Sequence, residues 1–253
     1  MKEIKFLTPP LNEVVFGVIF NAPDFSSVHY GLYWQEILAR FPKQIDRPAS
    51  GGEGLGLYFS PMPPLRRVWF ESEDEKALIQ LQSDRFYYNC RKQNNNEDYP
   101  RFKTIYPKFL QEWRFFQDWW EKETRELIPV HYEITYINHI DKAFGWNSPA
   151  DHKQVFTFAG GEWSDFLKPP ESHIFAMQFS LSDELGSLSV NGSQGVSTLN
   201  NESLIVLDLT IRSFDTTNID LDDWFNQAHD CINKSFLSLT QETIQKQWVL
   251  YEQ

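Results

Sequence analysis

The order of hydrophobic and polar residues along the chain predicts a protein rich in β-strands. Residues 13–20 form a β-branched and aromatic run between proline-containing segments, which is typical of a buried strand. Residues 76–82 and 85–91 flank Ser83-Asp84, a dipeptide that favours a hairpin turn. The same criteria predict further strands at 55–60, 66–71, 129–140, 172–180, 187–191 and 203–212.

Apolar residues at helical spacing mark three longer segments. A first helix is expected at 27–41, and Pro42 ends it. A second helix, at about 101–125, carries an unusually aromatic stripe. The last helix starts near Asp220, and a shorter extension of it is expected through Trp248.

Two regions show no clear periodicity. Residues 42–56 contain several glycines and are expected to form a loop. The region 143–171 is long for an irregular connection in a compact domain. We therefore expect it to contain a short strand at 154–158 or a helical turn at 163–167.

The sequence of these elements favours the α+β class. Strands grouped into antiparallel hairpins are followed by one long aromatic-rich helix, and this theme occurs twice. We therefore predict antiparallel sheets in two similar lobes, residues 1–128 and residues 129–253. One continuous domain, in which both long helices lie on one curved sheet, is the alternative.

Composition narrows the range of partners. The 253 residues include 35 acidic and 23 basic side chains, a net charge of −12, which disfavours a nucleic-acid partner. The 41% hydrophobic content excludes a disordered chain, and two cysteines exclude a disulfide scaffold. There is no apolar run of the roughly 20 residues that a membrane helix needs, and the N-terminus lacks the apolar region of a secretory signal. We expect a cytoplasmic protein with free thiols and no membrane partner.

Standard catalytic and cofactor motifs are missing from the chain. It contains no phosphate-binding GxxxxGK[ST] loop, no GxGxxG, no HExxH, no GxSxG and no CxxC. We therefore expect no cofactor and no metal centre. The absence favours a non-enzymatic protein without deciding the question.

Two strand faces could still carry chemistry. Alternation on the strand at 129–140 places His131, Glu133 and His139 on one side, where a histidine–carboxylate pair could bind a metal or transfer protons. The simpler interpretation is a polar, half-exposed strand face.

The strand at 85–91 presents the second polar face. Arg85, Tyr87, Asn89 and Arg91 alternate with apolar residues and would suit an anionic ligand, a peptide carboxylate or a nucleobase. The alternative is a solvated face whose arginines form ion pairs with neighbouring acidic residues such as Asp84.

The aromatic helix offers a candidate surface for a partner. Trp113, Trp119 and Trp120 lie within eight residues, together with two phenylalanines, and these rings exceed what one helix face usually buries. They either contact a second lobe, a second subunit or a partner protein, or they pack within the chain.

Several segments resemble a known group of sequences. The chain is similar to a sporadically distributed bacterial family of uncharacterised proteins of about 250 residues. The residues that carry the resemblance are Pro9–Phe16, Ile79–Phe86 with Asn89 and Arg91, Tyr99–Phe102, Tyr136–Ile140, and the C-terminal pattern of His229, Ile232, Phe236, Leu239 and Trp248. Cys90 departs from the pattern, because the resemblance implies a tryptophan before the arginine. The family's patchy distribution suits mobile accessory genes, and it supplies no catalytic residues.

Three hypotheses about function follow. The first is a non-enzymatic interaction or regulatory subunit of a small bacterial gene module, resembling an antitoxin, an immunity protein or an anti-phage defence protein. Its partner would be another protein encoded nearby, with a homodimer as a further alternative. The second is a ligand- or nucleic-acid-sensing module that uses the polar sheet face, and the third is a metal-assisted hydrolase or nuclease.

Overall fold

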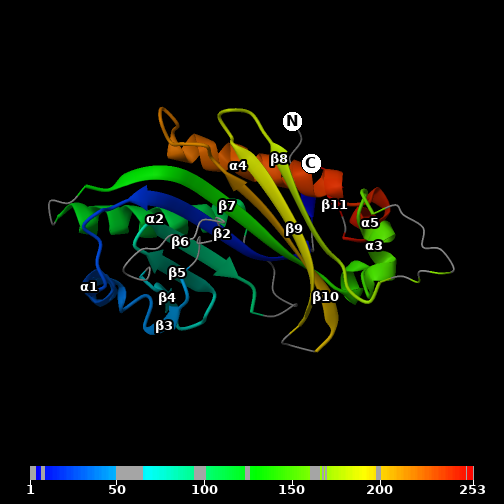
Figure 1. Cartoon of the computed structure of the whole chain (residues 1–253), viewed down its shortest axis with the longest axis horizontal. Coiled ribbons are helices and arrows are strands. Elements are labelled where there is room, and N and C mark those ends of the chain that lie inside the picture. Colours follow the sequence, from blue (N-terminus) through cyan, green and yellow to red (C-terminus); the bar gives the residue numbers. More distant parts are fainter. Residues whose placement is uncertain are drawn as a thin grey trace. The chain divides into compact units, whose positions relative to one another are not determined.

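The computed structural model of the chain belongs to the α+β class, as the sequence predicts. It describes residues 9–49, 65–93, 101–122, 126–159, 166, 168, 170–197 and 201–248, and the backbone of residues 4–6 and 250–252. Figure 1 shows the arrangement of its strands and helices. None of the helices in these ranges is both long and apolar enough to cross a bilayer.

The element order agrees with the predicted strands and helices at most places. The strands are β1 (Ile4–Phe6), β2 (Leu11–Asn21), β3 (Lys43–Arg47), β4 (Arg67–Glu71), β5 (Ala77–Gln82), β6 (Arg85–Arg91), β7 (Ile128–Ile140), β8 (Ile174–Ser180), β9 (Ser187–Val196), β10 (Ser203–Arg212) and β11 (Leu250–Glu252). The helices are α1 (Val28–Ile37), α2 (Phe102–Glu121), α3 (His152–Val155), α4 (Leu221–Leu239) and α5 (Glu242–Gln247), with 3-10 turns at Lys142–Phe144 and Pro149–Asp151.

The described strands form one antiparallel sheet of nine strands and one of two. The larger sheet has the order β3-β4-β5-β6-β2-β7-β10-β9-β8, and β1 pairs with β11. The chain divides into two compact units. The first, called the N-terminal unit here, comprises residues 15–93 and 100–133, and the C-terminal unit comprises residues 1–14, 94–99 and 134–253. The units interleave along the chain, so their boundaries differ from the predicted lobes 1–128 and 129–253.

Aromatic packing holds helix α2 against the sheet of the N-terminal unit (Figure 1). The ring of Phe16 on β2 stacks on Phe109, with centroids 5.1 Å apart, and Phe20 contacts Phe116 at 5.6 Å. Alternate residues of a strand point to the same side, so β2 presents a continuous apolar row to the helix. Full burial of such rings contributes about 1.5–3 kcal/mol each.

The tryptophans of α2 form part of this core. Trp113 and Trp120 are each only 1% exposed and lie against Phe20 and Phe25. Of the two sequence-based alternatives, the structure therefore shows intramolecular packing for these two residues, which corrects their assignment to a partner interface. Trp119 is half-buried against Tyr33, and its role at an interface stays a prediction.

Helix α4 covers one face of β10 in the C-terminal unit (Figure 1). Its buried stripe includes Trp224, Phe225, Ile232 and Phe236, and the leucines and isoleucines of β10 that alternate with polar residues are buried. Asp220 caps the helix, because its side chain accepts a hydrogen bond from the backbone N–H of Asp223 at 2.9 Å.

Two segments differ from the prediction. Residues 43–47, expected to be part of a loop, form the edge strand β3 on β4. Residues 152–155 form a helical turn where a short strand at 154–158 was expected, and Phe156 retains only an isolated bridge to Thr240. The predicted strand at 55–60 and most of the predicted helical turn at 163–167 lie outside the described residues. Cys90 and Cys231 are free, as expected.

Candidate functional site

The polar face of the N-terminal sheet carries four arginines and one tryptophan. We call this surface the arginine face. It comprises Arg47 on β3, Arg67 and Trp69 on β4, Gln80 on β5, and Arg85, Tyr87, Asn89 and Arg91 on β6. The residues between them in the strands, such as Val68, Phe70 and Phe86, are buried on the opposite side. The four β6 residues singled out by sequence alternation all belong to this face.

Gln80 fixes the side chains at the centre of the arginine face. Its Oε1 accepts hydrogen bonds from Nη1 of Arg67 at 2.8 Å and from Nε1 of Trp69 at 3.0 Å. Its Nε2 donates to Oδ1 of Asn89 at 2.7 Å. Gln80 and Asn89 are 7% and 3% exposed, so this network is held in a low-dielectric setting. The network orients Arg67 and Trp69 in advance of any ligand.

Three guanidinium groups lie close to the ring of Trp69. The Cζ atoms of Arg47, Arg67 and Arg91 lie 4.3, 5.5 and 5.7 Å from the centroid of its ring. Each distance is within the range of a cation–π contact, roughly 6 Å. The ring therefore offsets part of the repulsion among three positive charges.

Among the described residues, carboxylates pair with two of the four arginines. Arg85 donates to both carboxylate oxygens of Asp84, at 3.0 and 2.8 Å, and Arg91 donates to Glu71 at 2.9 Å. Among the residues that the structure describes, Arg47 and Arg67 have no carboxylate partner, and the buried Nε of Arg67 has no hydrogen-bond acceptor.

The register of the sheet places these two charges next to each other. Arg47 on β3 lies directly opposite Arg67 on β4. Like charges that face each other across neighbouring strands destabilise a sheet. Burial lowers the pKa of Arg67, Tyr87 opposes this effect, and the positive charges of Arg47 and Arg85 lower the pKa further. Among the described residues, the pair is thus a concentration of positive charge without a carboxylate partner, in a chain whose net charge is −12.

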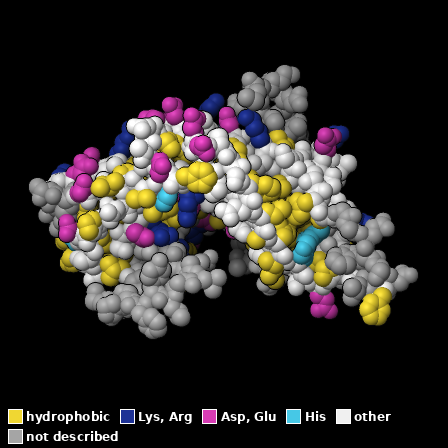
Figure 2. All heavy atoms as spheres, turned by 45° about the horizontal axis from the view of Figure 1, so that its top comes forward, with side chains coloured by type: hydrophobic (Ala, Val, Ile, Leu, Met, Phe, Trp, Pro, Cys, Tyr) yellow, Lys and Arg dark blue, Asp and Glu magenta, His cyan; other side chains and the backbone are white. Residues whose placement is uncertain are grey.

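Figure 2 shows how charged side chains are distributed on one face of the molecule. Acidic side chains are spread widely over this face, and Lys and Arg side chains form small groups between them. The clustering means that overall acidity does not exclude local recognition of an anion.

Tyr87 is held over a glycine at the border of the arginine face. A Cβ atom at Gly17 would lie 2.3 Å from Cε1 of Tyr87 and 3.4 Å from Cβ of Glu133. Only a residue without a side chain leaves room for the phenol ring here. Glu133 thus belongs to the border of the arginine face and is buried.

The other two predicted residues of β7 do not complete a metal site. His131 is half-buried in the N-terminal unit, and His139 lies in the C-terminal unit, where burial lowers its pKa and Asp141 opposes that shift. Within the described parts of the chain, no group of three or more His, Cys, Asp or Glu side chains could hold a metal ion.

Sequence reasoning missed Arg47, Arg67 and Trp69. Arg67 and Trp69 alternate with Val68 in the predicted strand at 66–71, which is a signal for a shared face. Arg47 gave no such signal, because the edge strand β3 is largely exposed and shows no hydrophobic alternation.

Comparison with known proteins adds no assignment for this site. No protein-family model, curated protein or solved structure matches the chain. The account of the arginine face therefore depends on its geometry and charge.

Proposed function

We propose that this protein is a non-enzymatic binding module that recognises a multivalent oxyanion, such as a pyrophosphate group, on the arginine face. The observation that carries the proposal is the pairing of Arg47 with Arg67, two arginines opposite each other on neighbouring strands that have no carboxylate partner among the described residues. Guanidinium groups match phosphate oxygens with paired, charge-assisted hydrogen bonds.

The hydrogen-bond network supports recognition more than catalysis. Gln80 and Asn89 hold Arg67 and Trp69 in place, and preorganised donors lose little entropy on binding. The face contains no described nucleophile paired with a general base. The expectation of a binding protein from a bacterial gene module stays a prediction, and burial of Trp113 and Trp120 removes part of its original support.

A calorimetric titration with inorganic pyrophosphate at low salt tests the proposal. Arg67→Gln should weaken binding tenfold or more, because a hydrogen bond to a charged group contributes about 1.5–3 kcal/mol. Arg66→Gln is the matched control. Arg66 is the neighbouring residue, is 75% exposed in its side chain, and lines a pocket with Val68 and Phe70 on the opposite side of the strand.

The outcomes separate recognition from general charge. Loss in Arg67→Gln with binding within about twofold of the parent in Arg66→Gln supports a specific site. Equal losses in the two variants, or no binding by the parent protein, would overturn the proposal. A titration with citrate shows whether clustered carboxylates substitute for phosphate oxygens. Citrate binding as tight as that of pyrophosphate would contradict a preference for phosphate.

A further inference from the structure

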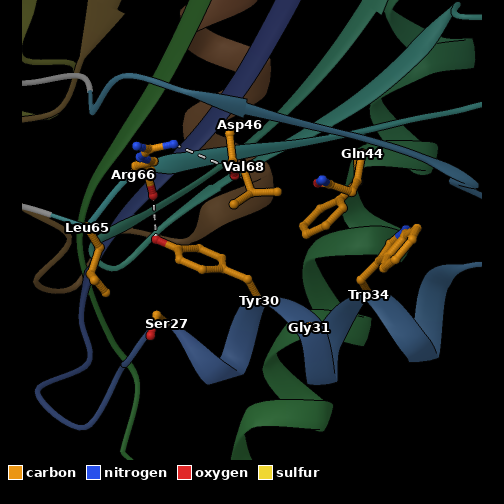
Figure 3. A pocket seen from close by; sticks show the side chains of 10 residues that line it. Ser27, Tyr30, Gly31, Trp34, Gln44, Asp46, Leu65, Arg66 and Val68 are labelled. Carbon is orange, nitrogen blue, oxygen red and sulfur yellow. Dashed lines mark hydrogen bonds and ion pairs between the residues drawn. The ribbon is translucent and has the colours of Figure 1, made fainter.

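A separate pocket lies on the other side of β3 and β4, within the N-terminal unit. It has a volume of about 540 Å³ and opens between these two strands and helix α1 (Figure 3). Pockets for small molecules usually measure roughly 300–1,000 Å³ and are mainly apolar with a few polar groups. This pocket is separate from the arginine face, because Val68 and Phe70 line it whereas Arg67 and Trp69 alternate with them.

Three aromatic side chains line the pocket. Tyr30 and Trp34 are four residues apart on α1 and project from it towards the strands (Figure 3), and Phe70 comes from β4. Hydrogen bonds hold two of the rings in place. The Tyr30 hydroxyl donates to the backbone oxygen of Arg66 at 2.7 Å, and Nε1 of Trp34 donates to the backbone oxygen of Phe41 at 3.0 Å.

Gly31 keeps the helix surface open between these rings. A Cβ atom at this position would have no other atom within 4 Å, and Gly31 itself lines the pocket. Glycine inside a helix costs about 0.5–1 kcal/mol relative to alanine. Packing therefore gives no reason for a glycine here, and its main structural effect is to leave space.

Two carboxylates lie near enough to Tyr30 to affect the pKa of its phenol. Burial raises the pKa of the Tyr30 phenol, and the carboxylates of Asp84 and Asp46 raise it further. Asp46 also lines the pocket, and its carboxylate is 56% exposed. Arg66 approaches Asp46 at 3.6 Å, but its side chain is 75% exposed, and such surface ion pairs contribute little.

Aromatic rings and a nearby carboxylate are the groups that recognise an organic ammonium ion. The ring faces attract the cation, and the carboxylate supplies a counter-charge. We infer that this pocket binds a small organic cation, an ammonium group attached to an apolar body, between Tyr30 and Trp34, with Asp46 at its margin.

A direct test uses benzyltrimethylammonium as the probe. Its binding to the full-length protein is followed by ligand-observed NMR and by Trp fluorescence. Gly31→Trp places a side chain into the open space and should reduce affinity tenfold or more. Leu32→Trp, the matched control, places the same side chain at the neighbouring, exposed position of α1, which does not line the pocket, and should leave affinity within about twofold of the parent. Circular dichroism and thermal melting establish that both variants fold.

Charge selectivity is tested without any change in the pocket's shape. Neopentylbenzene, the neutral isostere of the probe, should bind at least tenfold more weakly to the parent protein, and Asp46→Asn should weaken the cation about tenfold, or about 1.4 kcal/mol. Equal binding of the neutral isostere would overturn the inference, and so would undiminished binding by a folded Gly31→Trp variant. Failure of the parent protein to bind the cation at millimolar concentration would also overturn it.

The same titration distinguishes this pocket from the arginine face. Arg67→Gln should leave binding of the cation unchanged, because the Arg67 side chain lies on the other side of β4. A loss of cation binding in that variant would contradict the separation of the two sites.

Discussion

His152 makes the stability of the C-terminal unit depend on pH. The ring is only 5% exposed, and its Nδ1 accepts a hydrogen bond from Nε1 of Trp146 at 2.7 Å. It stacks on His173 with ring centroids 4.8 Å apart. Protonation would place an N–H on Nδ1 opposite the indole N–H, so the folded state favours the neutral ring.

The size of the effect follows from the pKa of this imidazole. The pKa of His152 is lowered from 6.5 to about 4, chiefly because burial disfavours the charged ring; His173 acts in the same direction and Asp151 opposes the shift. Because the folded pKa is depressed, the unfolded chain binds more protons between pH 6.5 and pH 4. Stability is therefore retained above pH 6.5 and falls as the pH drops. At pH 5 the loss relative to pH 7 is about 2 kcal/mol.

Urea unfolding at pH 7 and at pH 5 measures this loss in the parent protein and in His152→Phe. The substitution removes the titrating group but leaves the indole N–H without its acceptor, so the variant is less stable at pH 7. Its stability should change about 2 kcal/mol less than that of the parent between the two pH values. An NMR titration of the imidazole checks the same point directly. Equal pH dependence in both proteins, or a His152 pKa near 6.5, would refute the reasoning.

Two further substitutions test the packing and the charges of the sheet. Gly17→Ala should destabilise the protein by about 1–3 kcal/mol in urea unfolding, because the ring of Tyr87 must move. Gly31→Ala, where the added methyl group enters open space, should not destabilise it. Similar unfolding free energies for the two variants would contradict this prediction. Burial and the charge of Glu13 raise the pKa of Asp208 to about 6 in the folded protein. The protonated side chain therefore stabilises the fold at low pH, and this stabilisation is lost as the pH rises through 6. Asp208→Asn should therefore add about 2 kcal/mol at pH 7.5 and no stability at pH 4, and a loss of thermal stability at pH 7.5 would contradict the prediction.

Periodicity located the elements in which apolar and polar residue types recur at regular spacing. The alternation of Phe86, Tyr88 and Cys90 with polar residues predicted both the strand β6 and the face that carries Arg85 to Arg91. The aromatic stripe of α2 was equally clear. Its partner could not be read from the stripe, because the same pattern serves a protein interface and a core.

Elements that form because of contacts with other parts of the chain were not predicted from local sequence. Strand β3 exists because it pairs with β4, and its exposed, charged residues show no period of their own. Consequently the pairing of Arg47 with Arg67 was invisible in the sequence. At residues 149–155 a capping interaction decided the outcome. Asp151 accepts a hydrogen bond from the backbone N–H of Ser148 at 3.0 Å and favours helical turns over a strand.

The most direct measurement of the central claim is a titration of the protein with pyrophosphate, observed at the arginine Nε–H resonances. The Nε of Arg67 is buried and has no acceptor among the described residues. The account predicts that the Arg67 signal shifts as pyrophosphate is added and saturates at one equivalent, while the Arg66 signal stays in place. A shift of Arg66 instead, or no change at Arg67 at saturating pyrophosphate, would contradict recognition of an oxyanion by the arginine face.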